Sequence, residues 1–262
     1  MFEVLIASVA GARSSAGPAR IHAERVAMAA ADRRCRLLSD RDRRRLEAGV
    51  VQARSALMRA GGSEAAADAQ AAEARRAVAL KPCSDPVLLA EAARLRDSFA
   101  ALDGVSQMDF AGWTARRWGA DAWRIVHDAP GGARAGMIAA GSGLAVAVET
   151  PDATSVRSAR LVLRDSARAR PNELIALSAA GPAPALTRAI WAAERRPAES
   201  RPRIKAPPRA GHLFVFPAEA ADALARLDPR EPVWFEIDRP GRVERIRVTV
   251  ADFAPARAFL AP

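Results

Sequence analysis

Apolar side chains in the first hundred residues recur at intervals of three and four, the period of a helix with one buried face. Two such stripes flank Gly61-Gly62, a pair that ends one helix and lets the chain reverse. We therefore predict a helical hairpin between residues 39 and 82, whose two helices pack directly on each other. The first stripe comprises Leu46, Val50, Ala53 and Leu57, and the second comprises Ala67, Ala71, Ala74 and Val78.

The chain has two cysteines, and they bracket this hairpin. Cys35 lies just before the first helix and Cys83 just after the second, so an antiparallel hairpin would bring the two thiols together. We expect a disulfide, which would stabilise the fold by about 4 kcal/mol through loop-closure entropy. The alternative is two buried, reduced thiols. Two distant cysteines without a neighbouring histidine pair lack the ligands that zinc needs, so we expect no metal site, and no cofactor.

Two further helices are predicted beside the hairpin. Ser84-Asp85-Pro86 is a typical helix start, and Pro18 can open a weaker helix at the front of the chain. Together these elements predict an antiparallel bundle of three or four helices over residues 17–106. The stripe after Pro86 comprises Leu88, Ala92, Leu95, Phe99 and Leu102, and the one after Pro18 comprises Ile21, Met28 and Cys35.

From residue 107 the apolar spacing changes to alternation, the period of a strand with one buried face, while proline and glycine become frequent. We predict a domain boundary there, followed by a mostly antiparallel sheet domain with one or two short helices over residues 107–262. With the bundle this gives an α+β fold. Strands are expected at residues 123–127, 159–164 and 213–216, and a short helix at 217–227.

The clearest hairpin of this domain joins residues 233–238 to residues 243–250 across a Pro240-Gly241 turn. Alternation puts apolar pairs on one side, which we expect to face the core. The other side should be exposed to water or to a partner. The apolar pairs are Val233 with Val248 and Phe235 with Ile246, and the candidate partner face comprises Trp234, Glu236, Arg245 and Arg247, with Trp234 opposite Arg247 and Glu236 opposite Arg245.

A second hairpin is predicted around Gly141-Ser142-Gly143, between strands at residues 135–140 and 144–149. A three-residue connection would place Ile138 opposite Val146. The same glycines could suggest a phosphate-binding loop, but such a loop requires a helix directly after it. The residues after these glycines instead have the alternating pattern of a strand, so we favour the turn.

The first residues resemble part of a secretory signal, with an apolar core at residues 4–10 and a small-residue cleavage motif at Ala10-Gly11-Ala12. The basic opening of a signal is missing, because Phe2 and Glu3 stand there. The alternative is an apolar N-terminus without a targeting role. Together with the cysteines, residues 1–16 lead us to expect a periplasmic or secreted protein, the alternative being a cytoplasmic one. No transmembrane segment is expected, because the apolar run is far shorter than a spanning helix.

The chain is strongly basic, with a formal net charge of +10 and a pI near 11.2, which would attract anionic partners. Only two of its 40 basic residues are lysine, the bias that a G+C-rich coding sequence produces without selection for a ligand. Arginines are densest at residues 33–45 and again in a Pro/Arg-rich loop at 195–211, where prolines argue against regular structure. The candidate anion-binding residues are Arg41, Arg44, Arg45, Arg201 and Arg203.

No catalytic set stands out among the polar residues. His127 and Asp128 are neighbours on a predicted strand, so they point to opposite faces. Glu236 and Asp238 share a face, as in two-carboxylate hydrolases, but the nearby Arg245 favours the ionised forms, whereas acid catalysis needs a protonated carboxyl. Three tryptophans spaced five residues apart with arginines between them could stack bases, although indoles are more often buried. They are Trp113, Trp118 and Trp123.

These observations favour a non-enzymatic exported protein, periplasmic or in the envelope, with a binding or scaffolding role. Its partner is unknown, and we expect an anionic envelope component or another protein. The alternative is an intracellular protein that binds nucleic acid through its arginine clusters, which we consider less favoured because the arginine excess has a compositional explanation.

Overall fold

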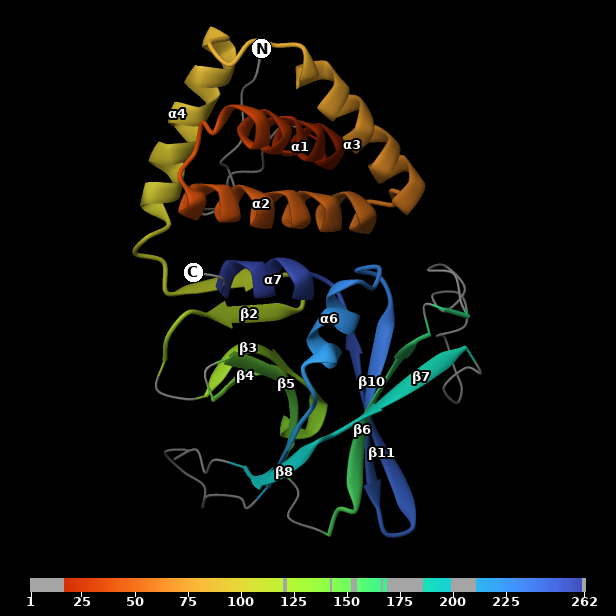
Figure 1. The fold of residues 1–262 in the computed structure, drawn as a ribbon. Helices are drawn as coiled ribbons and strands as arrows, with labels where there is room; N and C mark the ends of the chain where they lie inside the picture. Colours follow the sequence, from red (N-terminus) through yellow and green to blue (C-terminus); the bar gives the residue numbers. More distant parts are fainter. Residues whose placement is uncertain are drawn as a thin grey trace. The chain divides into compact units, whose positions relative to one another are not determined.

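The computed structural model of this protein describes residues 17–119, 122–141, 143–151, 155–165, 167–168, 186–198 and 211–260. It has the predicted α+β fold, with four helices followed by two antiparallel sheets (Figure 1). The contacts divide the chain into two compact units, Gln107–Ala256 forming one and the described residues up to Ser106 and from Arg257 forming the other. The signal-like segment 1–16 and the candidate residues Arg201 and Arg203 lie outside the described residues.

Each helix of the bundle after the first begins at a residue that caps its free backbone amides. The hydroxyl of Ser39 accepts a hydrogen bond from the Asp42 amide at 3.2 Å, and the hydroxyl of Ser63 accepts one from the Ala66 amide at 3.1 Å. The Asp85 carboxylate caps the fourth helix. None of the described helices is long and apolar enough to cross a membrane. The helices are α1 (Pro18–Cys35), α2 (Asp40–Arg59), α3 (Glu64–Ala79) and α4 (Pro86–Ala101).

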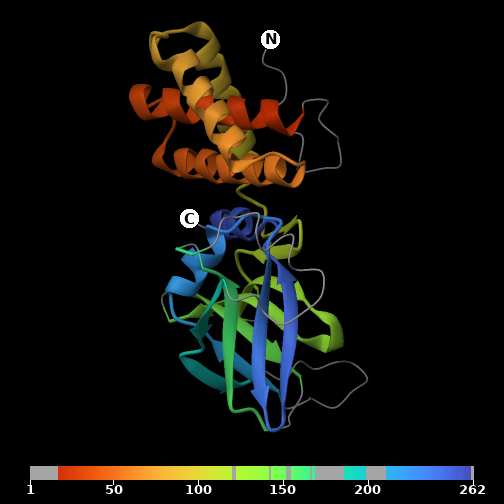
Figure 2. The same cartoon turned by 90° about the vertical axis from the view of Figure 1, so that its right-hand side faces the viewer.

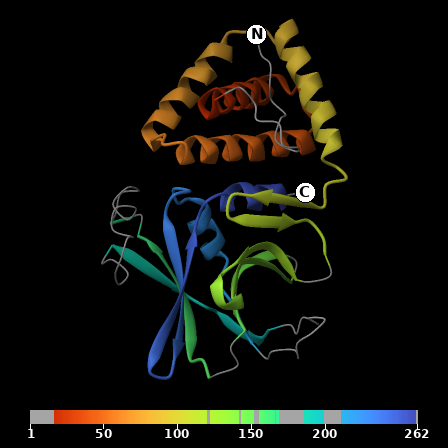
Figure 3. The ribbon, with the colours of Figure 1, turned by 180° about the vertical axis from the view of Figure 1, so that it is seen from behind.

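The centre of the bundle is α1, and here the predicted hairpin packing is wrong. The chain does reverse at Gly61, whose φ of +96° only glycine adopts without strain. However, α2 and α3 each pack mainly on α1, and α2, α3 and α4 surround it (Figures 1 and 3). The alanine stripe of α3 is buried as predicted, but Ala71 and Ala74 pack against Val26 of α1. Because α1 is rich in alanine and polar residues, its sequence did not indicate a central helix.

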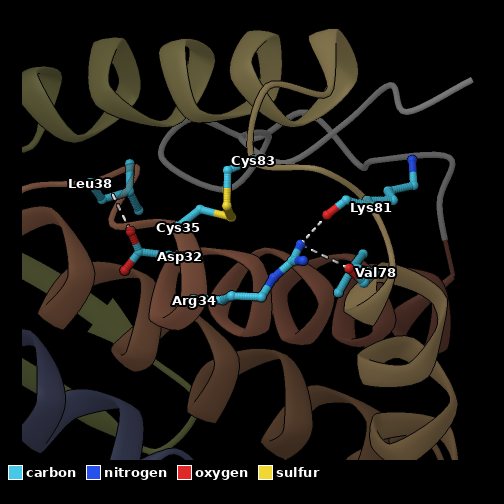
Figure 4. Close-up of a disulfide and its surroundings, with 7 residues drawn as sticks. All are labelled: Asp32, Arg34, Cys35, Leu38, Val78, Lys81 and Cys83. Carbon is cyan, nitrogen blue, oxygen red and sulfur yellow. Dashed lines mark hydrogen bonds between the residues drawn. A yellow bond between two sulfur atoms is a disulfide. The ribbon is translucent and has the colours of Figure 1, made fainter.

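The predicted disulfide between Cys35 and Cys83 is present (Figure 4). It joins the end of α1 to the segment between α3 and α4, with a Cα–Cα distance of 5.4 Å. Beside it, the Arg34 guanidinium donates hydrogen bonds to the carbonyls of Val78 and Lys81, at the end of α3 (Figure 4). Carbonyls at the end of a helix lack amide donors within it, so Arg34 helps to cap the end of α3 from α1. The disulfide and Arg34 thus fasten the same two segments.

The larger sheet of the second unit has seven antiparallel strands in the order β1-β2-β3-β4-β5-β9-β8. Its first two strands were not predicted as strands. A short 3-10 turn (Pro130–Gly132) separates β3 from β4. The strands are β1 (Gln107–Phe110), β2 (Trp113–Arg116), β3 (Trp123–Asp128), β4 (Arg134–Ala140), β5 (Gly143–Thr150), β8 (Glu194–Pro197) and β9 (His212–Val215).

The smaller sheet has the order β11-β10-β6-β7, and Figure 2 shows β6, β10 and β11 side by side. Phe235 of β10 meets Phe216, just beyond β9, with ring centroids 5.6 Å apart, so the two sheets share a core. Phe214, Leu161 and Leu163 are also fully buried. The elements are β6 (Ser158–Arg164), β7 (Thr187–Trp191), β10 (Pro232–Arg239) and β11 (Arg242–Thr249), with the helices α6 (Glu219–Ala225) and α7 (Phe253–Leu260) nearby in sequence.

Two predictions for these strands are wrong in detail. Ile138 lies opposite Ala145 rather than Val146, because Ala140 pairs with Gly143 and the turn is one residue shorter than predicted. The start of the expected Pro/Arg-rich loop is regular, since Glu194–Pro197 forms β8 on β9. A proline is tolerated there because β8 is an edge strand, whose outward side needs no amide donor. Ser142 and the rest of that loop at 199–210 lie outside the described residues.

Candidate interaction surface on the four-stranded sheet

The side of the four-stranded sheet that faces away from Phe235 carries the candidate partner face. The β10–β11 register is the predicted one, with Glu236 opposite Arg245 and Trp234 opposite Arg247. The other strands extend this register, because Glu236 also pairs with Arg160 of β6, and Arg160 with Trp191 of β7. Residues directly opposite one another share a face. One residue from each strand therefore forms a line, which we call the charged row: Arg245, Glu236, Arg160 and Trp191.

Glu236 is the centre of the charged row. Its Oε1 accepts a hydrogen bond from Arg245 Nε at 2.8 Å, and its Oε2 accepts one from Arg160 Nε at 2.6 Å. We expected this side of the hairpin to be exposed to water or to a partner, but only 2 % of Glu236 is exposed, so for Glu236 that expectation is wrong. The two arginines flank it on both sides and shield it from water. Because charge-assisted hydrogen bonds hold both partners, the arginine heads are fixed in position.

Trp191 forms the exposed end of the charged row. The Arg160 Cζ lies 5.3 Å from the centroid of its ring, within the range of a cation–π interaction. The indole itself is 54 % exposed, an unusual amount for a tryptophan. Exposed tryptophan next to arginine is typical of the residues that contribute most to protein–protein binding. The arrangement can bind a surface, since it offers a flat ring and oriented guanidinium groups.

The face carries an excess of positive charge. Arg245 uses only its Nε on Glu236, and no described residue pairs with Arg247, which is exposed one register position further along β11. Val243 on the same side of β11 is 47 % exposed. Asp238 is half-buried in the next register row. An anionic or acidic partner would therefore be favoured over a basic one.

A second cluster of charges in the same unit is buried and self-contained. Arg164 Nε donates to Glu231 Oε2 at 2.9 Å, and Glu231 Oε1 accepts from the Asp228 amide at 3.0 Å. Arg230 in turn donates to both oxygens of Asp228. Burial raises the pKa of Glu231, against the pull of Arg164. Since each carboxylate oxygen of this cluster is satisfied from within the chain, the cluster supports the fold.

The candidate anion-binding arginines of the bundle do not form one site. Arg41 and Arg45 both pair with Asp103, and Arg45 also donates to the Phe99 carbonyl. Hydrogen bonding from Arg45 lowers the pKa of Asp103. Arg44 is exposed and makes a contact of its own. Arg45 also lies 3.7 Å from Asp42. The two carboxylates together offset the charges of Arg41 and Arg45, which leaves less attraction for an external anion.

The remaining residues singled out in the sequence are the tryptophans and the histidines. The Trp113 and Trp123 rings are buried, and Trp118 is 57 % exposed, so the three do not form an exposed stack. His127 Nδ1 lies 2.9 Å from the Gly112 carbonyl, and His22 lies in the bundle. Within the described ranges, no three His, Cys, Asp or Glu side chains gather as a metal site would require.

Sequence reasoning found half of the charged row and missed the rest. Glu236 and Arg245 belong to one hairpin, so alternation places them opposite each other. Arg160 and Trp191 come from strands far away in the sequence, and Arg160 lies 76 positions from Glu236. No local pattern indicates which strand lies beside β10. Because the hairpin already supplied Arg245 as a partner for Glu236, nothing in the sequence indicated that a second arginine lies next to it.

No protein-family model matches this chain, nor does any curated protein or any solved structure.

Proposed function

We propose that this protein is exported to an oxidising compartment, the periplasm or the envelope, and acts there as a non-catalytic binding protein. Its partner docks on the outer face of the four-stranded sheet. The observation that carries the proposal is the charged row, in which Glu236 holds Arg160 and Arg245 in place beside the exposed ring of Trp191. Fixed side chains lose little conformational entropy on binding, so a prepared surface of this kind binds well for its area.

The disulfide supports the compartment. Cys83 is exposed and Cys35 is half-buried, so the bond is accessible to cellular reductants. Disulfides of this kind persist in oxidising compartments and are rare in the cytosol. The signal-like residues 1–16 support export independently. The nucleic-acid alternative has less support, because the best-placed arginines of the bundle already pair with Asp103.

Photo-crosslinking in native cells tests the proposal. A photo-crosslinking amino acid is placed at Val243, on the proposed face, and in a control protein at Leu80, which is 96 % exposed in the bundle. We expect an adduct from position 243 in the envelope or periplasmic fraction, none from position 80, and a mass that shows the disulfide. A protein found in the cytosol with two free thiols, or one that forms no adduct at position 243, would contradict the proposal.

A further inference from the structure

The outer strand of the proposed face is an edge with unused backbone groups. In the described part of the chain, β11 pairs with β10 on one side and ends the sheet on the other. The ladder with β10 continues into a bond from the Val250 amide to the Glu231 carbonyl at 2.9 Å, so the even-numbered residues of β11 bond to β10. The backbone groups of Val243, Arg245, Arg247 and Thr249 therefore point away from the sheet.

The side chains of the same residues select for charge. Arg245 and Arg247 lie two residues apart, so they project from the same face of the edge. Arg245 donates only its Nε to Glu236, and Arg247 has no partner among the described residues. A strand added to β11 would place every second side chain beside these guanidinium groups. Charge complementarity therefore requires acidic residues at alternate positions of the added strand.

The opposite face of β11 selects for apolar residues. Ile246 and Val248 point into the core and are buried. Positions of the added strand next to them would lie at the margin of that core, where apolar side chains are favoured. The preferred segment thus alternates acidic and apolar residues, the pattern of a strand with one solvent-exposed face.

We infer that β11 binds an extended, acidic segment of a partner protein by strand addition. This inference rests on the proposed function and specifies the partner. A nucleic acid would also be attracted by the arginines, but the edge offers carbonyl acceptors as well as amide donors. A phosphate backbone has no donors for those carbonyls, whereas a peptide supplies one at each alternate position. The length of β11, eight residues, is enough for a short peptide to pair along it.

The experiment uses the full chain with its disulfide intact and three short acetylated, fluorescently labelled peptides. In the first, glutamate alternates with valine. In the second, lysine replaces glutamate. The third is the glutamate peptide N-methylated on the amides that would face β11, which keeps its charge but removes its donors. Fluorescence anisotropy gives the affinities, and amide hydrogen exchange reports on the edge. We expect binding of the first peptide only, with new protection at the Arg245 and Arg247 amides.

Arg247→Glu should weaken binding of the glutamate peptide by about tenfold and should let the lysine peptide bind. The matched control is Arg226→Glu, because Arg226 is exposed after α6 and has no side-chain partner among the described residues. This control should change neither affinity. Both replaced side chains are exposed, so the melting temperature should stay close to that of the unchanged protein.

Equal binding of the N-methylated peptide would overturn strand addition. Binding of a random DNA duplex that weakens with Arg247→Glu, without binding of any peptide, would overturn it in favour of nucleic acid. If no peptide binds but position 243 still forms its crosslink in cells, this inference fails and the proposed function stands. If the crosslink is also missing, both fail.

Discussion

His22 of α1 has 2 % of its surface exposed, and its Nδ1 is 3.1 Å from Oε1 of Gln70 in α3. Burial lowers the pKa of this imidazole below the ordinary value of 6.5. The folded protein therefore prefers the neutral ring. Glu24, two residues further along α1, behaves in the opposite way, because burial raises the pKa of its carboxyl. His22 therefore makes the bundle less stable at low pH, whereas Glu24 makes it less stable at high pH.

We expect the contribution of His22 to be fully present above pH 6.5 and to be lost as the pH falls through its lower folded pKa. Thermal melting between pH 8 and pH 5 should show a fall in stability that His22→Gln reduces, because an amide can keep the bond to Gln70 but does not titrate. Comparing the two proteins cancels the effect of Glu24. His127→Gln, in the other unit, should leave the slope of the bundle unchanged, and an equal slope in His22→Gln would contradict the prediction.

Glu231 and Glu236 both pair with arginine, but neutralising them should cost different amounts of folding stability. Glu231→Gln leaves the buried Arg164 without a counter-charge, so we expect a loss of about 3 kcal/mol in the free energy of unfolding. Glu236→Gln leaves Arg160 and Arg245, whose side chains are 39 % and 45 % exposed and stay hydrated, so the loss should be about 1 kcal/mol. Urea titration of both variants checks this, and the reverse order would refute it.

At the scale of elements, the sequence was informative wherever a structure is local. The β10–β11 register was correct because a Pro-Gly turn and strict alternation determine it within a single hairpin, and the α3 stripe was correct because helical spacing determines it. The β4–β5 register was wrong by one residue because Gly141 permits a tighter turn than the one we assumed. The role of α1, the position of Arg160 and that of Trp191 depend on contacts between distant segments, which no single stretch specifies.

Gly136 of β4 shows a constraint that only the folded sheet imposes. Its φ is +149°, and a Cβ there would lie 2.1 Å from the Ile125 carbonyl oxygen of β3. Gly136→Ala should therefore cost about 2 kcal/mol or more, because the backbone of β3 or β4 must shift. Gly143→Ala, at the start of β5, is the matched control, since a Cβ there meets nothing within 4 Å. Chemical denaturation would contradict the prediction if the two variants were equally stable.

At the scale of the whole molecule, the net charge of +10 is a poor guide to function. Many arginines have partners in the chain: Arg43 with Asp32, Arg134 with Glu149 and Arg164 with Glu231. Each of these pairs already cancels in the net charge, so the excess of ten remains, but only the structure shows at which positions it is exposed. The charge that remains for a partner depends on which guanidinium groups are exposed and oriented. At the β11 edge, exposed and oriented guanidinium groups lie beside unused backbone groups, while the exposed ring of Trp191 lies at the opposite edge of the same sheet.

The disulfide should stabilise one unit of the molecule and leave the other unchanged. Cys35 and Cys83 lie 48 positions apart and both belong to the bundle, while the sheets have a core of their own. Closing that loop should contribute about 4 kcal/mol to the bundle. Calorimetry of the full chain should therefore show two transitions, of which reduction lowers one. The double variant Cys35→Ser with Cys83→Ser should reproduce the reduced protein without added reductant. A single transition that moves as a whole would mean that the two units unfold together.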